Sequence, residues 1–300
     1  MQTIKLIIQT DGALTDALSD YLIGMFDAAV EFQASETTMA ELHGFLQPDD
    51  SSVAGLAALR RQVEAYGDDL AAVFGCSPPA ISIEEIDNQD WAERWKEHFK
   101  AFEIVPGLVI APTWESYRAD GAIQVLRMDP GMAFGTGQHE TTRLCLQMLR
   151  EPDLIGPETT LLDVGTGTGI LGMAALLFGA ARVVAIDNDE EAVKAALANA
   201  ELNRLSEKMA VSGTPLAELS TTFQVVVANI VHDVLLELAD DLVRVVQPGG
   251  MLVLSGLIEG EQSTNIARVF AEKRCQLIRQ DCDGQWAALQ LRKARSGKSG

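Results

Sequence analysis

The stretch LLDVGTGTGI, residues 161–170, decides the fold class, because an apolar run ends in an acid and opens into a loop with three glycines. Such a loop between a strand and a helix lets a ligand approach the backbone closely and lets the helix pack against the strand. Gly165, Gly167 and Gly169 follow a Gly-x-Gly-x-Gly spacing, and Ile170 stands where a dinucleotide fingerprint has its third glycine. The loop predicts a ligand site and counts against a pyrophosphate.

Strand-like and helix-like segments alternate strictly after Thr159. The expected strands cover residues 160–165, 182–187, 223–230 and 251–256, and the expected helices cover residues 169–179, 189–203, 233–246 and 260–272. This alternation predicts right-handed crossovers and a doubly wound, mostly parallel sheet. Two further apolar runs flank Asp283-Gly284, a hairpin turn signal, so the sheet should end in an antiparallel pair. By analogy, this α/β Rossmann-like design is typical of class I methyltransferases rather than dehydrogenases.

Asp187 ends the second expected strand, 22 residues after Gly165. A carboxylate at this place can accept hydrogen bonds from both hydroxyls of an adenosine ribose. A glycine loop followed by such an acid fits either NAD or S-adenosylmethionine. Because S-adenosylmethionine has no phosphate and carries a sulfonium cation, Asp163 just before the loop favours it. A nicotinamide-dependent oxidoreductase and a binding module without activity are the alternatives.

Asn229 lies at the end of the apolar run FQVVVANI. An amide in such a run needs several hydrogen-bond partners if it is buried. It either closes the strand as a cap or turn, or it binds the methionine end of the cofactor and orients an incoming amine. In the second case Asn229 is a catalytic residue.

The part of the chain before the alternating segments predicts a small α+β domain of the ferredoxin-like type. We expect strands at 3–9, 29–34 and 81–86 and helices at 12–27 and 52–74. Trp91, Trp95 and Phe99 form one apolar stripe on a short helix, either as a connector or as an aromatic substrate platform. The predicted domains are residues 1–88, the small domain; residues 89–125, the aromatic helix and the strands after it; and residues 126–300, the α/β domain.

The net charge of −20 argues against nucleic acid as the primary partner, since phosphate binding needs a basic surface. Residues 1–90 hold 16 acids and three bases, so they alone carry −13. This segment is either a solvated surface or a docking surface for a basic protein. The four cysteines and four histidines lack metal-ligand spacing, and no run resembles a signal peptide or a membrane span. We therefore expect a cytoplasmic monomer without a metal.

The chain resembles the PrmA-type ribosomal protein methyltransferases, which methylate protein eleven of the large ribosomal subunit. The matching segments, in family order, are DWAERWKEHFKAFEI, LVIAPTWE, MDPGMAFGTGQHETT, LLDVGTGTGILGMAALLFGA, AIDNDEEAV and VVVANIVHDVL. The resemblance implies a class I methyltransferase domain after a mobile substrate-recognition domain. It also implies that Thr142, Gly165, Asp187 and Asn229 contact S-adenosylmethionine. Ile230-Val231-His232 departs from the Ile-Leu-Ala that is common in the family.

The most specific of these segments is GMAFGTGQHETT, residues 131–142. Its glycines first suggest a phosphate loop, but Gln138 and His139 stand where a Walker motif has Lys and Ser or Thr. We expect the loop to fold over the methionine end of the cofactor, with Phe134 as a lid. His139 either relays a proton or fixes the loop, and Thr141 or Thr142 is expected to cap the helix that follows.

The residues and the resemblance together predict an S-adenosylmethionine-dependent protein N-methyltransferase. Its expected substrate is large-subunit ribosomal protein eleven, methylated on lysine side chains, an N-terminal α-amine, or both. A methyltransferase of another lysine-bearing protein or of a small amine is the alternative. The neutral amine attacks the sulfonium methyl in line, so lysine, with a reference pKa of about 10.4, must first lose its proton.

Overall fold

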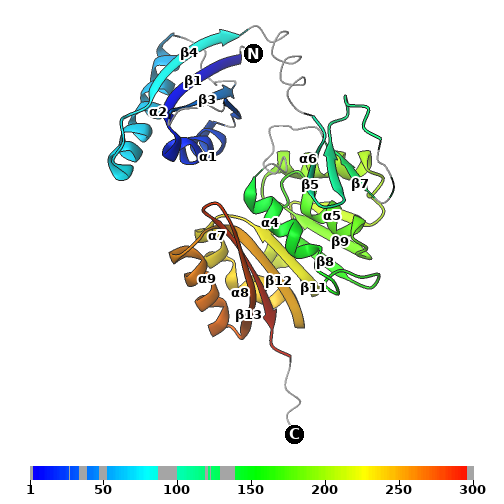
Figure 1. Cartoon of the computed structure of the whole chain (residues 1–300). Coiled ribbons are helices and arrows are strands. Elements are labelled where there is room, and N and C mark those ends of the chain that lie inside the picture. Colours follow the sequence, from blue (N-terminus) through cyan, green and yellow to red (C-terminus); the bar gives the residue numbers. More distant parts are fainter. Residues whose placement is uncertain are drawn as a thin grey trace. The chain divides into compact units, whose positions relative to one another are not determined.

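The computed structural model describes residues 3–26, 28–33, 39–46, 53–86, 100–118, 121, 123–128 and 139–295. The chain divides into two compact units, Met1–Phe99 and Lys100–Gly300, which are coloured in sequence order in Figure 1. Residues 100–125, expected in a separate middle segment, belong to the second unit. The aromatic stripe Trp91, Trp95 and Phe99 lies outside the described residues.

The first unit is a four-stranded antiparallel sheet with two helices. Its elements are β1 (Thr3–Asp11), the 3-10 helix η1 (Gly12–Leu14), α1 (Thr15–Phe26), β2 (Ala29–Gln33), β3 (Met39–Leu46), α2 (Val53–Phe74) and β4 (Ala80–Ile86). The strand order β2-β3-β1-β4 is that of a ferredoxin-like fold, which confirms the predicted type. Alternate residues of β1, such as Leu6, pack with Leu18 of α1 and Val63 of α2, so both helices cover one face of the sheet.

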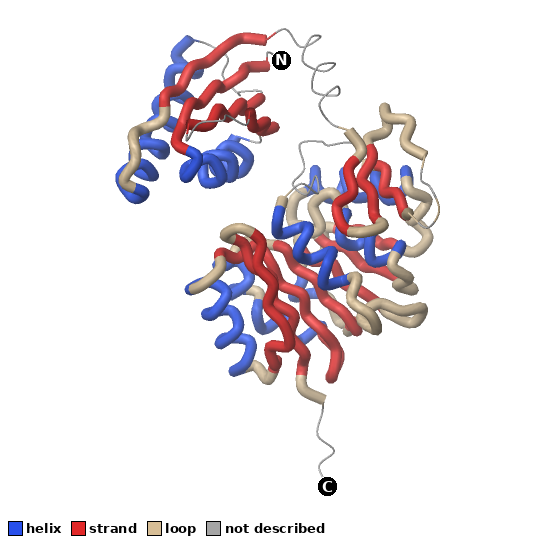
Figure 2. The backbone as a smooth tube through the Cα atoms, in the orientation of Figure 1, coloured by secondary structure: helices blue, strands red, loops and turns tan. Residues whose placement is uncertain are grey.

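The second unit is built on a seven-stranded sheet of order β10-β9-β8-β11-β12-β14-β13. Its strands are β8 (Thr160–Val164), β9 (Arg182–Ile186), β10 (Met209–Ser212), β11 (Phe223–Asn229), β12 (Val246–Ile258), β13 (Cys275–Asp283) and β14 (Trp286–Lys293). The first five strands of this order are parallel, and β14 and β13 add an antiparallel hairpin. The predicted α/β fold with an antiparallel end is therefore confirmed (Figure 2). The pairing of β13 with β14 shifts in register between Leu277 and Arg279.

Helices alternate with these strands as the sequence predicts, with one interruption. They are α4 (Glu140–Leu149), α5 (Ile170–Leu177), α6 (Glu190–Leu202), the 3-10 helix η2 (Leu216–Glu218), α7 (His232–Glu237), α8 (Ala239–Val245) and α9 (Glu261–Glu272). The single helix expected over residues 233–246 is two short helices that meet at Leu238. Within the described part of the chain, no helix is long and apolar enough to cross a membrane.

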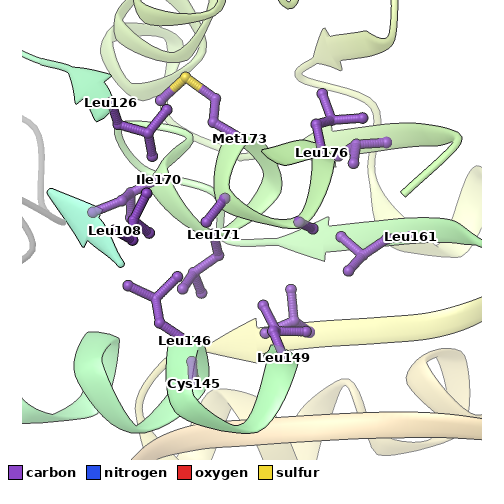
Figure 3. Packing of buried hydrophobic residues seen from close by; sticks show 14 of the residues in the cluster. Leu108, Leu126, Cys145, Leu146, Leu149, Leu161, Ile170, Leu171, Met173 and Leu176 are labelled. Atoms are coloured by element: carbon purple, nitrogen blue, oxygen red, sulfur yellow. The ribbon is translucent and has the colours of Figure 1, made fainter. Parts of the chain in front are cut away.

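The parallel strands are buried on both faces, and each face has its own hydrophobic core. Leu161 of β8 contributes to one core with Leu146 and Leu149 of α4 and Ile170 of α5 (Figure 3). The neighbouring residue of β8, Leu162, contributes to the other core, which includes side chains of α7, α8 and α9. Continuous apolar strands such as VVVA in β11 are what a doubly covered sheet requires.

A small three-stranded sheet packs on the first of these cores. It consists of β5 (Phe102–Val105), β6 (Leu108–Ala111) and β7 (Gln124–Arg127), and Leu108 and Leu126 join the core. Asn203, which follows α6, ties this sheet to the unit. Its Nδ2 donates to the Arg127 carbonyl at 2.7 Å, and its Oδ1 accepts from the Arg127 N–H at 2.8 Å.

Candidate active site

The predicted ligand-binding residues meet at the carboxyl edge of the parallel strands. Val164, the last residue of β8, lies opposite Ile186 of β9 and Ala228 of β11. The residues that follow, Gly165, Asp187 and Asn229, therefore emerge side by side. In open α/β sheets this edge is where ligands bind.

The glycine loop needs glycine for two separate reasons. Gly165, Gly167 and Gly169 have φ angles of +68°, +53° and +84°, which L side chains rarely adopt. A Cβ at Gly165 would also lie 2.5 Å from Cγ2 of Ile230, the residue directly after Asn229. The loop thus packs its bare backbone against the segment that carries Asn229.

Asp187 is held in a fixed orientation at the end of β9. Its Oδ2 accepts a hydrogen bond from the Gly167 N–H at 2.8 Å, and its Oδ1 accepts one from the Asp189 N–H at 3.1 Å. Asp187 is only partly buried, so both oxygens keep lone pairs that can accept further hydrogen bonds. This arrangement suits the vicinal hydroxyls of a ribose.

Asp163 is fully buried beneath the glycine loop and is incompletely paired. Its Oδ2 accepts from the Thr166 hydroxyl at 2.7 Å and from the Gly172 N–H at 3.0 Å, whereas Oδ1 has no hydrogen-bond partner among the described residues. Burial raises the pKa of Asp163 to about 6, although the two hydrogen bonds lower it, and the charge of Asp187 raises it further. A buried carboxylate with one unpaired oxygen fits a cationic ligand such as S-adenosylmethionine better than a pyrophosphate.

Asn229 and Thr142 approach each other from different elements. Nδ2 of Asn229 is 3.5 Å from the hydroxyl oxygen of Thr142, which lies in the first turn of α4 and is 1% exposed. The segment after Asn229 crosses β12 closely: a Cβ at Gly256 would lie 2.4 Å from the carbonyl oxygen of Ile230. Gly256 was not predicted, because its role depends on this crossing and not on a local motif.

His139 is the N-cap of α4, in place of the expected Thr141 or Thr142. Its Nδ1 accepts from the backbone N–H of Thr141 at 3.3 Å and from the Thr141 hydroxyl at 2.8 Å. With Nδ1 as acceptor, the neutral ring carries its proton on Nε2. The imidazole also packs edge-on against Trp286, with ring centroids 4.8 Å apart. Of the two predicted roles for His139, these contacts favour fixing the start of the helix.

The remaining predicted contact, Phe134, lies outside the described residues with residues 129–138. Sequence reasoning also missed Trp286, which the antiparallel hairpin brings to His139. No local pattern marks Trp286, because its position depends on the pairing of β14 with β12, where it lies opposite Ile258.

Comparison with known proteins supports the same interpretation. A family model described as ribosomal protein L11 methyltransferase (PrmA) matches residues 2–294. A ribosomal protein L11 methyltransferase of Desulfotalea psychrophila is 41% identical over 292 residues, which are 97% of this chain and 97% of that protein. A protein of the same name from Geobacter sp. (strain M21) is 35% identical, over 96% of this chain and 97% of its own length.

A solved structure of a similarly named protein also resembles this chain. The crystal structure of a ribosomal protein L11 methylase from Lactobacillus delbrueckii subsp. bulgaricus is 35% identical, with a TM-score of 0.60. It matches 65% of this chain and 100% of its own. The site geometry and these whole-length similarities agree, and this chain belongs to the ribosomal protein L11 methyltransferase family.

Proposed function

We propose that this chain transfers methyl groups from S-adenosylmethionine to amino groups of ribosomal protein L11, on lysine side chains, the N-terminal α-amine, or both. The observation that carries the proposal is the meeting of the glycine loop, Asp187 and the Asn229–Thr142 pair at one sheet edge. Relatives named for this activity match the chain over nearly its whole length. This makes another protein or a small amine the less favoured acceptor.

S-adenosylmethionine supplies an electrophilic methyl group on its sulfonium. Asp187 holds the ribose hydroxyls, while the glycines at 165, 167 and 169 let the cofactor lie against the backbone. The carboxylate of Asp163, ionised above its pKa of about 6, gives the site a negative charge that favours a cation. Thr142 and Asn229 bind the methionine end. On the basis of the sequence, we propose that Phe134 covers the cofactor as a lid.

The acceptor must arrive as a neutral amine. Its nitrogen attacks the methyl carbon as the carbon–sulfur bond breaks, and the methylated ammonium then releases a proton to solvent. The amide oxygen of Asn229 accepts a hydrogen bond from the amine and orients its lone pair. Nearby carboxylates favour the ammonium form, so the acceptor position must keep water away from a lysine to lower its pKa. A proton relay through His139 would have to use Nε2, because Nδ1 serves the helix cap.

The acidic first 90 residues are the proposed docking region for a basic ribosomal protein. The same negative charge disfavours direct contact with nucleic acid. We also propose that the chain works as a monomer in the cytoplasm, where ribosomal proteins are made. Opposite charge on the substrate raises the rate of encounter more than the final affinity.

The test combines the purified chain, labelled S-adenosylmethionine and purified ribosomal proteins, followed by mass mapping. Label on amino groups of L11 is the expected result, and label on other proteins alone would refute the substrate. Calorimetry with S-adenosylhomocysteine and with NADH tests the cofactor separately. Binding of NADH without binding of S-adenosylhomocysteine would return the chain to the oxidoreductase class.

A further inference from the structure

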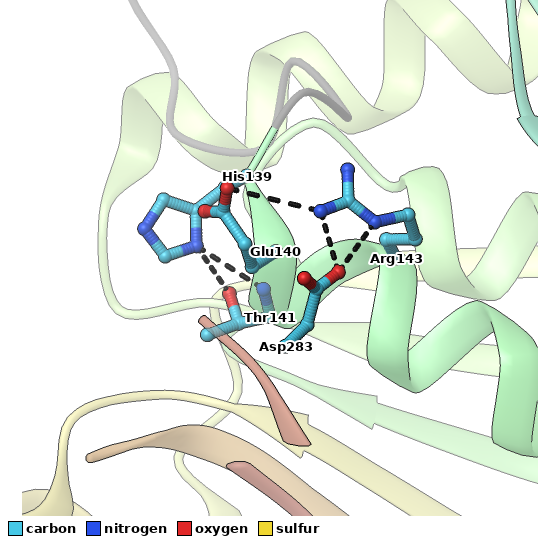
Figure 4. A network of polar contacts seen from close by, with 5 residues as sticks. All are labelled: His139, Glu140, Thr141, Arg143 and Asp283. Atoms are coloured by element: carbon cyan, nitrogen blue, oxygen red, sulfur yellow. Dashed lines mark hydrogen bonds and ion pairs between the residues drawn. The ribbon is translucent and has the colours of Figure 1, made fainter. Parts of the chain in front are cut away.

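The tip of the β13–β14 hairpin touches the start of α4, far from it in sequence. We call this the hairpin–helix contact and define it by His139 and Arg143 on the helix side and Asp283 and Trp286 on the hairpin side. Figure 4 shows His139, Arg143 and Asp283. Nε and Nη2 of Arg143 both donate to Oδ2 of Asp283, over 2.8 Å and 2.6 Å. The Trp286 ring packs against the ring of His139, the N-cap of the same helix. Two polar bonds and one ring contact therefore fix one helical turn.

This turn carries a proposed cofactor contact. Thr142 lies next to Arg143 and between it and the N-cap, and its hydroxyl faces Nδ2 of Asn229. Rotation or displacement of the first turn would change the separation of Thr142 and Asn229, which is already 3.5 Å. Whatever holds the turn consequently sets this separation.

We propose that Arg143 and Asp283 are positioning residues: through the hairpin–helix contact they hold the first turn of α4 so that Thr142 stands beside Asn229 in the cofactor site. This inference rests on the proposed function, because Thr142 and Asn229 are themselves proposed cofactor contacts. Neither Arg143 nor Asp283 needs to touch the cofactor.

The Arg143–Asp283 ion pair can position the first turn of α4 but should contribute little to the stability of the fold. Both side chains are about one third exposed, at 33% and 37%, and ion pairs of this kind contribute little to folding. If Asp283 loses its charge, Arg143 still has Glu140, whose Oε1 is 3.7 Å from Nη2. The arginine is then not left unpaired, so a substitution at Asp283 should move the helix start without unfolding the unit.

The same hairpin and helix provide a matched control. Arg279 of β13 forms an ion pair with Glu151, two residues beyond the end of α4. This second pair joins β13 to the turn just after α4, at the opposite end of the helix from Thr142. Asp281 also pairs with Arg279, so Glu151→Gln leaves the arginine a partner, as Asp283→Asn does for Arg143.

The experiment compares wild type with Arg143→Met, Asp283→Asn, their double variant, Arg143→Lys and Glu151→Gln in the full chain. Calorimetry gives the Kd for S-adenosylhomocysteine, methylation of L11 gives kcat and KM, and thermal unfolding gives Tm. We expect Arg143→Met and Asp283→Asn each to weaken binding by about tenfold, a usual size for coupled neighbours. The double variant should bind S-adenosylhomocysteine no more weakly than the single variant with the lower affinity, because both substitutions break the same contact.

Arg143→Lys keeps the charge but loses the two-nitrogen geometry, so it should bind the ligand between wild type and Arg143→Met. Glu151→Gln should stay within about twofold of wild type. Wild-type affinity in both Arg143→Met and Asp283→Asn would overturn the inference, as would an equal loss in Glu151→Gln, which would indicate general docking of the helix. Failure of the wild type itself to bind S-adenosylhomocysteine would instead refute the proposed function.

Discussion

Asp187 and Asp189 show how two acids, two residues apart, serve different ends. Asp187 accepts from the Gly167 and Asp189 N–H groups at the carboxyl edge of the sheet. Asp189 instead acts within the next helix, since its Oδ1 accepts from the Glu191 N–H at 2.9 Å and caps α6. One carboxylate is available to a ligand and the other completes a helix.

Asp187→Ala should therefore weaken binding of S-adenosylhomocysteine by about tenfold or more, because hydrogen bonds to a charged group are lost. Asp189→Ala is the control and should show the opposite pattern. It should lower the free energy of unfolding by about 1 kcal/mol, the usual value of an N-cap, and leave affinity nearly unchanged. Calorimetry and denaturant unfolding of both variants measure the two effects. Equal affinities in the two variants would remove Asp187 from the cofactor site.

Asp163 makes stability depend on pH in a direction opposite to that of a salt-bridged acid. Its pKa in the folded chain is about 6, above the usual 3.8, so folding favours the protonated form. The protonated form adds stability below the ordinary pKa, and this contribution is lost as pH rises through 6. Above that pH the buried charge is present in full.

Wild type should accordingly gain about 1 kcal/mol relative to Asp163→Asn when the pH falls from 7.5 to 5.5. Denaturant unfolding of both proteins at the two pH values measures the difference, and the subtraction removes the other carboxyl groups. Bound S-adenosylmethionine should reduce the change, because its positive charge favours the ionised carboxylate. A difference that is constant with pH would show that Asp163 titrates normally.

At the scale of elements, the glycine loop is the unit that joins β8, β9 and the segment after β11. Gly165→Ala meets both a positive φ and the side chain of Ile230, whereas Gly179→Ala, just after α5, meets only a positive φ of +108°. Gly179→Ala should cost about 1 kcal/mol, and Gly165→Ala about 1 kcal/mol more. Only Gly165→Ala should also lower affinity for S-adenosylhomocysteine, because Ile230 directly follows Asn229. Denaturant unfolding and calorimetry of both variants test this. Equal losses of stability and of affinity in the two variants would mean that the Ile230 side chain moves aside at little cost.

Most of the second unit could be predicted from the sequence because its pattern is local. Buried parallel strands give continuous apolar runs, and the residues after them, Gly165, Asp187 and Asn229, could be placed at one edge by topology alone. β3 could not be predicted, because Gly44 interrupts its pattern. That glycine is explained only by packing, since a Cβ there would lie 2.9 Å from Leu22 of α1.

The parts of the site that escaped prediction depend on contacts between distant segments. Arg143 and Asp283 are 140 positions apart, and neither has a sequence pattern that marks a site. The division between α7 and α8 was also missed, because the apolar spacing continues through Leu238.

For the whole molecule, the uneven distribution of charge should separate the proposed docking of the substrate from the binding of the cofactor. Residues 1–90 carry −13, and the other 210 residues carry 27 acids and 20 bases, only −7. The first unit should therefore attract the proposed basic substrate most strongly. This electrostatic attraction acts within a Debye length of about 10 Å at 0.1 M salt. S-adenosylhomocysteine lacks the sulfonium and its positive charge, so its binding should depend little on salt.

Raising KCl from about 0.05 M to about 0.5 M should increase KM for L11 several-fold and leave the Kd for S-adenosylhomocysteine nearly constant. Steady-state methylation and calorimetry in the same buffers measure the two quantities. Neutralising Glu64, which pairs with Arg60 on α2, is not a suitable control because it also frees a base. Exchanging KCl for an uncharged osmolyte at equal osmolality is the better control. A KM that does not change with salt would contradict docking by charge.

The register shift between Leu277 and Arg279 has a consequence for solubility. β13 is an edge strand of the seven-stranded sheet, and its Leu277 and Ile278 side chains are exposed. A long regular strand at this place would offer its free hydrogen-bonding groups to another chain and invite aggregation. The irregular pairing bends the strand, and the charged Arg279 and Asp281 stand beside the apolar pair. The other outer strand, β10, avoids the same risk by being only four residues long.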